Sequence, residues 1–164
     1  MRRVLVPLDG AQLDESVAAA IPQVTGSRDV EVVLIRVLQP PSADSIDGSG
    51  DALLNRMVAR IEEATTAIAR TAVFLRAHVR QVTTVVRYGA PVAEILDAAR
   101  QLDVDFIAMR PYGRHGRHDS SFNLVAEGVL RNAGIPVLMI PAAPRAVAAQ
   151  REHGRKLTAR RAAA

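Results

Sequence analysis

The chain has 164 residues, enough for one domain with a sizeable core, and 49% of them are hydrophobic although only 3% are aromatic. It has no cysteine, which excludes disulfides, zinc–thiolate centres and cysteine nucleophiles. The net charge of +4 does not indicate a nucleic-acid-binding surface on the predicted domain, because residues 1–144 contain 15 Lys/Arg against 16 Asp/Glu.

The sequence divides into a predicted domain, residues 1–144, and a basic tail, residues 145–164. The tail contains six Lys/Arg and one Glu, a composition typical of a solvated, flexible end; a helix that contacts anionic partners is the alternative. No apolar run approaches the roughly 18 residues of a membrane span, and the start, MRRVLVPLDG, is too polar for a signal peptide. We therefore expect a soluble, cytoplasmic protein without membrane contact.

The first half of the chain predicts two strands and two helices. Residues 3–8 (RVLVPL) are a short apolar run with β-branched residues, typical of a strand, and apolar residues at helical spacing follow from Leu13 to Val24. Asp29–Leu38 is the second predicted strand, and the polar segment Gln39–Gly50, rich in Pro and Gly, is a predicted loop. A long helix is expected over about Asp51–Ala77, with one apolar face formed by Leu54, Met57, Val58, Ile61, Ala64, Ile68, Ala72 and Leu75.

The second half continues the alternation of strands and helices. Pro91 suits the first turn of a helix, since its ring fixes a helical φ and its missing N–H has no partner there. Alternation of this kind indicates an α/β fold with a doubly wound, five-stranded parallel sheet and right-handed crossovers. The expected elements are a strand at Gln81–Arg87, a helix at Pro91–Leu102, a strand at residues 106–109 (FIAM), a helix around Ser121–Ala133 and a strand at Val137–Ile140.

Two polar segments follow predicted strands and are expected to share one crevice. In doubly wound sheets, ligands bind beyond the carboxyl ends of the strands, where the strand order reverses. Asp9 follows the first strand, and residues 110–124 (RPYGRHGRHDSSFNL) follow the fourth. The second segment crowds Gly, Arg and His at a position where α/β proteins often bind phosphate.

Metal binding and catalysis are both weakly indicated by the same segment. His115, His118 and Asp119 are metal-ligand types, but the arginines around them would repel a cation. Ser120, His118 and Asp9 supply the residue types of a hydrolase triad, yet the chain has no G-x-S-x-G nucleophile elbow. We expect neither a resident metal nor enzymatic activity.

Three ordered segments resemble the universal stress protein family, and the match runs from Val4 to Pro141, nearly the whole predicted domain. Residues 4–10 (VLVPLDG) are similar to its opening strand, residues 88–109 (YGAPVAEILDAARQLDVDFIAM) to its glycine turn, helix and fourth strand, and residues 125–141 (VAEGVLRNAGIPVLMIP) to its ending. The resemblance implies strand order 3-2-1-4-5, a homodimer joined through the last strand, Val137–Ile140, and a stress-linked regulatory role rather than a catalytic one.

The family's ATP motif, G-x-x-G-x9-G-[S/T] after the fourth strand, is degraded in this chain. Arg110 replaces the first glycine and Gly113 keeps the second, while Asn123 and Leu124 replace the closing glycine and hydroxyl residue. Those glycines let backbone N–H groups approach phosphate oxygens, and the hydroxyl adds a donor at the helix start. Three of the four motif positions therefore lack the chemistry that the family uses.

Arginines offer a second way to hold a phosphate. Arg110, Arg114 and Arg117 each carry a guanidinium that can bind phosphate bidentately, and Gly116 supplies backbone freedom between them. A site rebuilt around these arginines and a loop that has lost its nucleotide are both compatible with the sequence.

The resemblance also assigns roles to residues at the other strand ends. It implies that Pro7 and Asp9 line the crevice, with Asp9 near the ribose, and that backbone atoms of Val37 face an adenine. An aspartate at this position equally suits a turn or a helix N-cap, and the side chain of Val37 belongs to the core.

Two functions follow from these observations. The first is a stress-related regulatory protein with an altered site for ATP or AMP. The second is a nucleotide-free, dimeric stress-response protein that acts through an unknown protein partner. The two functions differ in whether the chain still binds a nucleotide despite the replacement of three motif positions by Arg110, Asn123 and Leu124.

Overall fold

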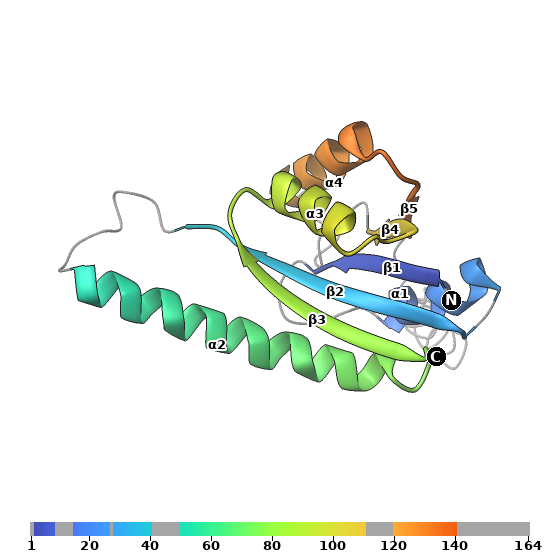
Figure 1. The fold of residues 1–164 in the computed structure, drawn as a ribbon, viewed down its shortest axis with the longest axis horizontal. Helices are drawn as coiled ribbons and strands as arrows, with labels where there is room; N and C mark the ends of the chain where they lie inside the picture. Colours follow the sequence, from blue (N-terminus) through green and yellow to red (C-terminus); the bar gives the residue numbers. More distant parts are fainter. Residues whose placement is uncertain (1, 9–14, 27, 41–49, 111–119, 141–164) are drawn as a thin grey trace, which may run out of the picture.

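The computed structural model describes residues 2–8, 15–26, 28–40, 50–110 and 120–140, with the side chains of residues 15–19 and 120–123 left aside. Strands and helices alternate along the described chain (Figure 1). The strands are β1 (Arg2–Pro7), β2 (Val30–Leu38), β3 (Gln81–Tyr88), β4 (Phe106–Met109) and β5 (Val137–Met139). The helices are α1 (Glu15–Thr25), α2 (Gly50–Leu75), α3 (Pro91–Gln101) and α4 (Ser120–Asn132).

The strands form one parallel sheet in the order β3-β2-β1-β4-β5. This confirms both the doubly wound class and the order implied by the family resemblance. β1 lies at the centre, where Leu5 pairs with Val33 of β2 on one side and with Ile107 of β4 on the other. Val4, Leu5 and Val6 are almost fully buried, as apolar runs in a sheet covered on both faces should be.

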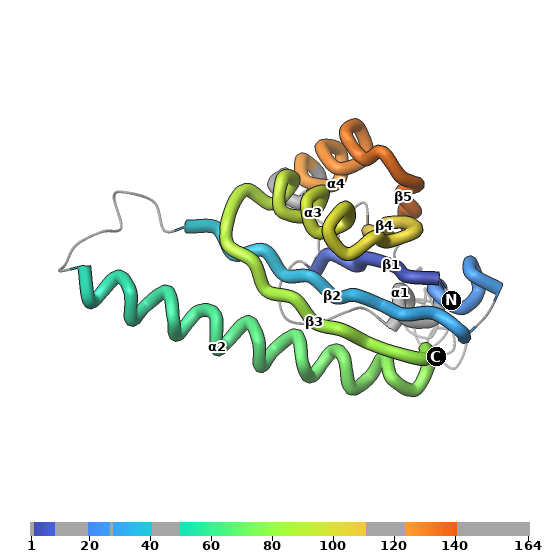
Figure 2. Tube along the Cα trace, viewed as in Figure 1, coloured from blue at the N-terminus to red at the C-terminus, as the bar shows by residue number. Residues whose placement is uncertain are grey.

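Each face of the sheet packs against two helices (Figure 2). Side chains of β1 and β2 alternate between the two faces, so Val4 and Val32 pack with α1 and α2, whereas Leu5 and Val33 pack with α3 and α4. The helix residues that meet the sheet are Ile21, Ile68, Ala72 and Leu75 on the first face and Ile95, Ala98, Ala99, Ala126 and Val129 on the second.

Helix α2 is buried along only part of its predicted apolar face. In its C-terminal half, Ile68 and Leu75 are at most 1% exposed. In its N-terminal half, Leu54 is 59% exposed and Val58 46%, because this end of the helix runs past the end of β3 (Figure 1). The spacing of the apolar residues correctly predicted the helix, but it did not show where the sheet beneath the helix ends.

The element bounds differ from the sequence predictions by a few residues. α2 begins at Gly50 and ends at Leu75, and α4 begins at Ser120. β5 ends at Met139, although the N–H of Ile140 still donates to the carbonyl of Met109 at 2.7 Å. Pro91 occupies the first turn of α3, as predicted.

The two-part division at residue 144 cannot be judged from the structure, since residues 141–164 lie outside the described ranges. Most of the predicted loop Gln39–Gly50 lies outside them as well. No helix in the described part of the chain combines the length and the apolar composition that crossing a membrane requires.

Candidate functional site

The strand order reverses between β1 and β4, and this switch point marks the candidate site. β2 and β3 lie on one side of β1, whereas β4 and β5 lie on the other, so the connections leave β1 and β4 in opposite directions. Leu8 follows β1 and Arg110 follows β4. Since Leu5 pairs with Ile107, Leu8 and Arg110 each stand three residues further along neighbouring strands. Residues 9–14 and 111–119 continue from these two points.

Pro7 and Val37 lie at or near the carboxyl ends of β1 and β2, on one side of the switch point. Pro7 is the last residue of β1, is buried and pairs with Ile35 of β2. The next residue, Leu8, donates its N–H to the carbonyl of Ile35 at 2.8 Å, which extends the sheet beyond Pro7. Val37 lies near the end of β2, and its side chain packs partly buried against the core on the α3 and α4 face, as predicted.

Arg110 is the one arginine of the predicted phosphate cluster that the structure describes. It directly follows β4, is half-buried, and its Nε atom is shielded from solvent. A guanidinium thus stands at the carboxyl end of β4, where the family motif has a bare glycine backbone. The sheet brings Pro7, Val37 and Arg110 to the carboxyl ends of adjacent strands, on both sides of the switch point.

Most of the other predicted site residues fall outside the description. Asp9, Gly113, Arg114, Gly116 and Arg117 lie outside the described residues. So do the metal-ligand candidates His115, His118 and Asp119. Within the described ranges, no group of three or more His, Asp or Glu is arranged to hold a metal ion.

The start of α4 faces the same end of the sheet. Its first residue is Ser120, its first turn contains no acidic residue, and the N–H groups at a helix start favour a negatively charged ligand. Asn123 lies in this turn, with its side chain outside the description. Leu124, at the motif's hydroxyl position, is 65% exposed and has no side-chain donor. The helix can therefore offer backbone donors to a phosphate, but not the family's hydroxyl.

The end of β3 adds polar groups at a place where the sequence predicted only a turn. The hydroxyl oxygen of Tyr88 is buried without a hydrogen-bond partner among the described residues. Gly89 has a φ of 150° and donates its N–H to the carbonyl of Leu38 at 3.0 Å, so it joins the ends of β3 and β2. In the sequence, these groups are indicated by a tyrosine at the end of a strand, directly before a glycine.

Arg87 already contacts neighbouring side chains at the carboxyl end of the sheet. Its guanidinium donates to Oε1 of Gln101 at 2.6 Å and lies 3.6 Å from a carboxylate oxygen of Glu94. Both side chains of this ion pair are about a quarter exposed or less. Arg87 therefore fixes α3 against β3 and is a poorer phosphate ligand than Arg110.

Comparisons with solved structures find the same fold. A hypothetical protein, MJ0577, superimposes with a TM-score of 0.71 at 21% identity over 87% of this chain and 97% of that one. Universal stress protein UspA from Lactobacillus plantarum gives 0.64 at 20% identity, over 85% and 97%. A universal stress protein from Archaeoglobus fulgidus, solved in complex with dAMP, gives 0.56 at 18% identity, over 85% and 98%. A comparison with curated proteins found no match.

The family comparison agrees with the fold. Residues 1–141 match the Universal stress protein family, which covers most of the 164 residues. The chain belongs to the universal stress protein family.

Proposed function

We propose that this chain is a regulatory stress protein whose adenine-nucleotide site has been rebuilt around arginine. The observation that carries the proposal is the position of Arg110, a half-buried guanidinium at the switch point where the family motif has glycine. A guanidinium supplies planar, charge-assisted donors to phosphate, so it can replace the backbone donors that the glycines expose. The role is binding rather than catalysis.

The ligand class follows from the chemistry of the crevice and from related proteins. The N–H groups at the start of α4 favour an anion, and the buried ends of β1 and β2 give a base an apolar surface. Three structural relatives were solved with dAMP, cAMP and AMP, respectively. AMP, whose single phosphate requires fewer donors than a triphosphate, is therefore the expected ligand, with ATP the weaker one.

Calorimetric titration of AMP and ATP into the purified protein tests this proposal. AMP binding should weaken in Arg110→Ala and should fall steeply with salt, since a charged donor carries the affinity. The matched control is Arg131→Ala, which removes an arginine that is 73% exposed in the last turn of α4. Absence of heat with either nucleotide, or equal binding by both variants, would refute the arginine site.

The second candidate function is a nucleotide-free interaction protein. Leu124 favours it, because an exposed leucine at the start of α4 suits contact with a protein better than contact with a phosphate. Under this proposal, Leu124→Ser should leave nucleotide binding absent and should weaken capture of a protein partner. Restored AMP binding in Leu124→Ser would instead indicate a nucleotide site blocked by the leucine.

We also propose that the protein is a homodimer through β5. β5 is an edge strand that pairs only with β4 among the described strands, and Val137, Leu138 and Met139 are each only partly buried. Two such edges can pair antiparallel about a two-fold axis. Light scattering should find a dimer that Met139→Glu converts to monomer, whereas a new charge at Gly50 should not. A monomeric wild-type protein at micromolar concentration would overturn the proposal.

A further inference from the structure

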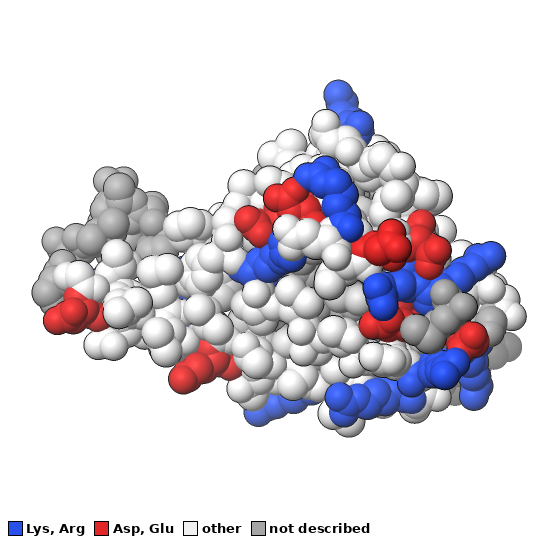
Figure 3. Space-filling view, viewed as in Figure 1, with Lys and Arg blue, Asp and Glu red and all other residues white. Residues whose placement is uncertain are grey.

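Arginines gather at the opposite, amino end of the sheet. Arg2 opens β1, Arg28 precedes β2, and Arg76 and Arg80 lie in the connection from α2 to β3; all four are exposed. The N–H of Arg80 donates to the carbonyl of Arg28 at 3.1 Å, so the starts of β2 and β3 are held together. Figure 3 shows several positively charged side chains, with acidic ones among them, at the end of the molecule where β2 and β3 begin.

This concentration is local. Residues 1–144 as a whole carry one more acidic than basic side chain, so four exposed arginines around the starts of three adjacent strands are not a reflection of general basicity. Neighbouring strands lie about 4.8 Å apart, so Arg28 and Arg80, just before β2 and β3, are close enough to line one pocket. Side chains crowded at this spacing repel one another unless an anion lies between them.

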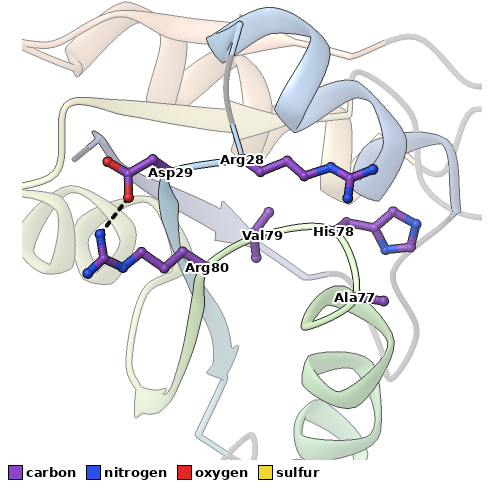
Figure 4. Close-up of a pocket in the computed structure, with 6 residues that line it drawn as sticks. All are labelled: Arg28, Asp29, Ala77, His78, Val79 and Arg80. Carbon is purple, nitrogen blue, oxygen red and sulfur yellow. Dashed lines mark hydrogen bonds and ion pairs between the residues drawn. The ribbon is translucent and has the colours of Figure 1, made fainter.

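A pocket of about 360 Å³ lies in the middle of this group (Figure 4). Its lining residues come from the two connections that enter β2 and β3. The side chains of Arg28 and His78 project to one side of the pocket, and those of Arg80 and Asp29 to the other, with Val79 between the two pairs and Ala77 on the side of His78. The volume is at the small end of the range for ligand pockets, which suits a compact group.

The two sides of the pocket differ in how their charges are satisfied. Arg80 donates to a carboxylate oxygen of Asp29 at 2.7 Å, so these two charges largely offset each other. The guanidinium of Arg28 makes no hydrogen bond or ion pair with any described residue. Arg28 is therefore the uncompensated cation of the pocket.

His78 is oriented by the end of α2. Its Nδ1 lies 3.3 Å from the carbonyl oxygen of Phe74, and its ring centroid lies 5.3 Å from that of Phe74. The carbonyl oxygen can only accept a hydrogen bond, so Nδ1 carries the hydrogen in this contact, and Nε2 is available to a ligand as an acceptor in the neutral ring. The backbone N–H groups of His78 and Val79 both donate to the carbonyl of Leu75. Side chains, and not the backbone, would therefore hold an anion in this pocket.

We propose that this pocket binds a phosphoryl group between Arg28 and His78, on the side opposite the ion pair of Arg80 with Asp29. The guanidinium of Arg28 can donate to phosphate oxygens, and Nε2 of His78 can accept a hydrogen bond from a protonated phosphoryl oxygen. The phosphoryl group can belong to a small free phosphate compound or to a phosphorylated side chain of a partner protein. The site lies at the end of the sheet opposite the crevice of Arg110, and it does not depend on the nucleotide proposal.

Amide NMR titrations with inorganic phosphate, at constant ionic strength set by chloride, test the proposal. Phosphate should shift the signals of residues 28–30 and 76–80, at the amino end, at concentrations where equal ionic strength of chloride does not. A parallel titration with a capped phosphoserine distinguishes the sources: tighter binding than phosphate indicates a phosphorylated partner, and weaker binding a small compound. Shifts confined to residues 36–38 and 87–89, at the carboxyl end, would overturn the amino-end site.

Two substitutions should change phosphate affinity in opposite directions. Arg28→Gln should weaken it roughly two- to fivefold, in keeping with the strength of exposed ion pairs. Asp29→Asn should strengthen it by a similar factor, because it removes a repelling carboxylate from the pocket. Both side chains are exposed, so both variants should fold.

The matched control is Arg56→Gln, which removes an exposed arginine in the N-terminal half of α2. It lowers the net charge by the same amount without touching the pocket, so its affinity for phosphate should equal that of the wild type. If Arg28→Gln and Arg56→Gln weaken binding equally, the effect is one of net charge and the pocket is not a site.

Discussion

The two ends of the sheet differ in how tightly the chain is anchored. At the amino end, the connections into β2, β3, β4 and β5 contain only four or five residues each. At the carboxyl end, the connections after β1, β2 and β4 contain 7, 11 and 10 residues, and only the one after β3 is short, with two. Long connections on a rigid sheet are where binding residues are most easily placed and altered.

Packing and charge follow the same division. At the amino end, the buried carboxylate of Glu31 accepts hydrogen bonds from Arg3 at 2.8 Å and Thr83 at 3.2 Å, which ties three strands together. Arg3 also donates to the carbonyl of Leu102 at 2.6 Å, and so reaches the end of α3. At the carboxyl end, α2 leaves the sheet with its apolar face exposed at Leu54. The contrast indicates that stabilising contacts between strands are concentrated at the amino end, whereas the long connections are at the carboxyl end.

Substitutions in the two halves of α2 should show this contrast most strongly. Ile68→Ala empties a position that is 1% exposed, and it should lower the free energy of unfolding by about 3 kcal/mol. Leu54→Ala, at a position 59% exposed, should lower it by less than about 0.5 kcal/mol. Urea unfolding measures both values. Similar losses at the two positions would mean that the N-terminal half of α2 is also covered.

The buried carboxylate at the amino end should give the next largest effect. Glu31→Ala leaves Arg3 and Thr83 without their shared acceptor, and we expect a loss of about 2 kcal/mol, reduced from that of a fully buried pair because Arg3 is 39% exposed. Glu31→Gln keeps an acceptor oxygen and should lose less. Equal unfolding free energies for the wild type and Glu31→Ala would show that the network adds nothing to stability.

The glycine turn after β3 is the exception at the carboxyl end, and it should respond to substitution. Gly89→Ala should cost about 1 kcal/mol, because a φ of 150° is unfavourable for a residue with a Cβ. The new Cβ would also lie 2.6 Å from Oε1 of Glu94, a flexible side chain that can move aside. If the double variant with Glu94→Ala recovers wild-type stability by thermal unfolding, contact with Glu94 and not the backbone angle is the cause.

The smallest expected effect is the acid response of the exposed ion pair at the amino end. The hydrogen bond from Arg80 lowers the pKa of Asp29 below its ordinary 3.8, partial desolvation opposes this shift, and the charge of Arg80 adds to it. A carboxylate with a lowered pKa stabilises the fold above its unfolded pKa, and this contribution is lost as the pH falls through the folded pKa. NMR titration should find the pKa of Asp29 closer to 3.8 in Arg80→Gln. An unchanged value would exclude Arg80 as the cause.

The sequence by itself determined the elements and their class. Short apolar runs such as residues 3–8 and 106–109 are typical of buried strands, and the helical spacing of apolar residues predicts the bounds of α2 to within two residues. These features depend on local periodicity, which is determined by residues that are close together in the sequence. The family resemblance extended the prediction to the strand order, and the structure confirms it.

Tertiary structure decided what lies beyond the reach of local pattern. The exposure of Leu54, the network around Glu31 and the pocket between Arg28 and His78 each depend on segments about thirty to eighty residues apart in sequence. In the sequence, Arg28 and His78 are two unrelated polar residues in separate connections. They share one pocket because a parallel sheet gathers the starts of all its strands at one end, and only the strand order sets which of them are neighbours.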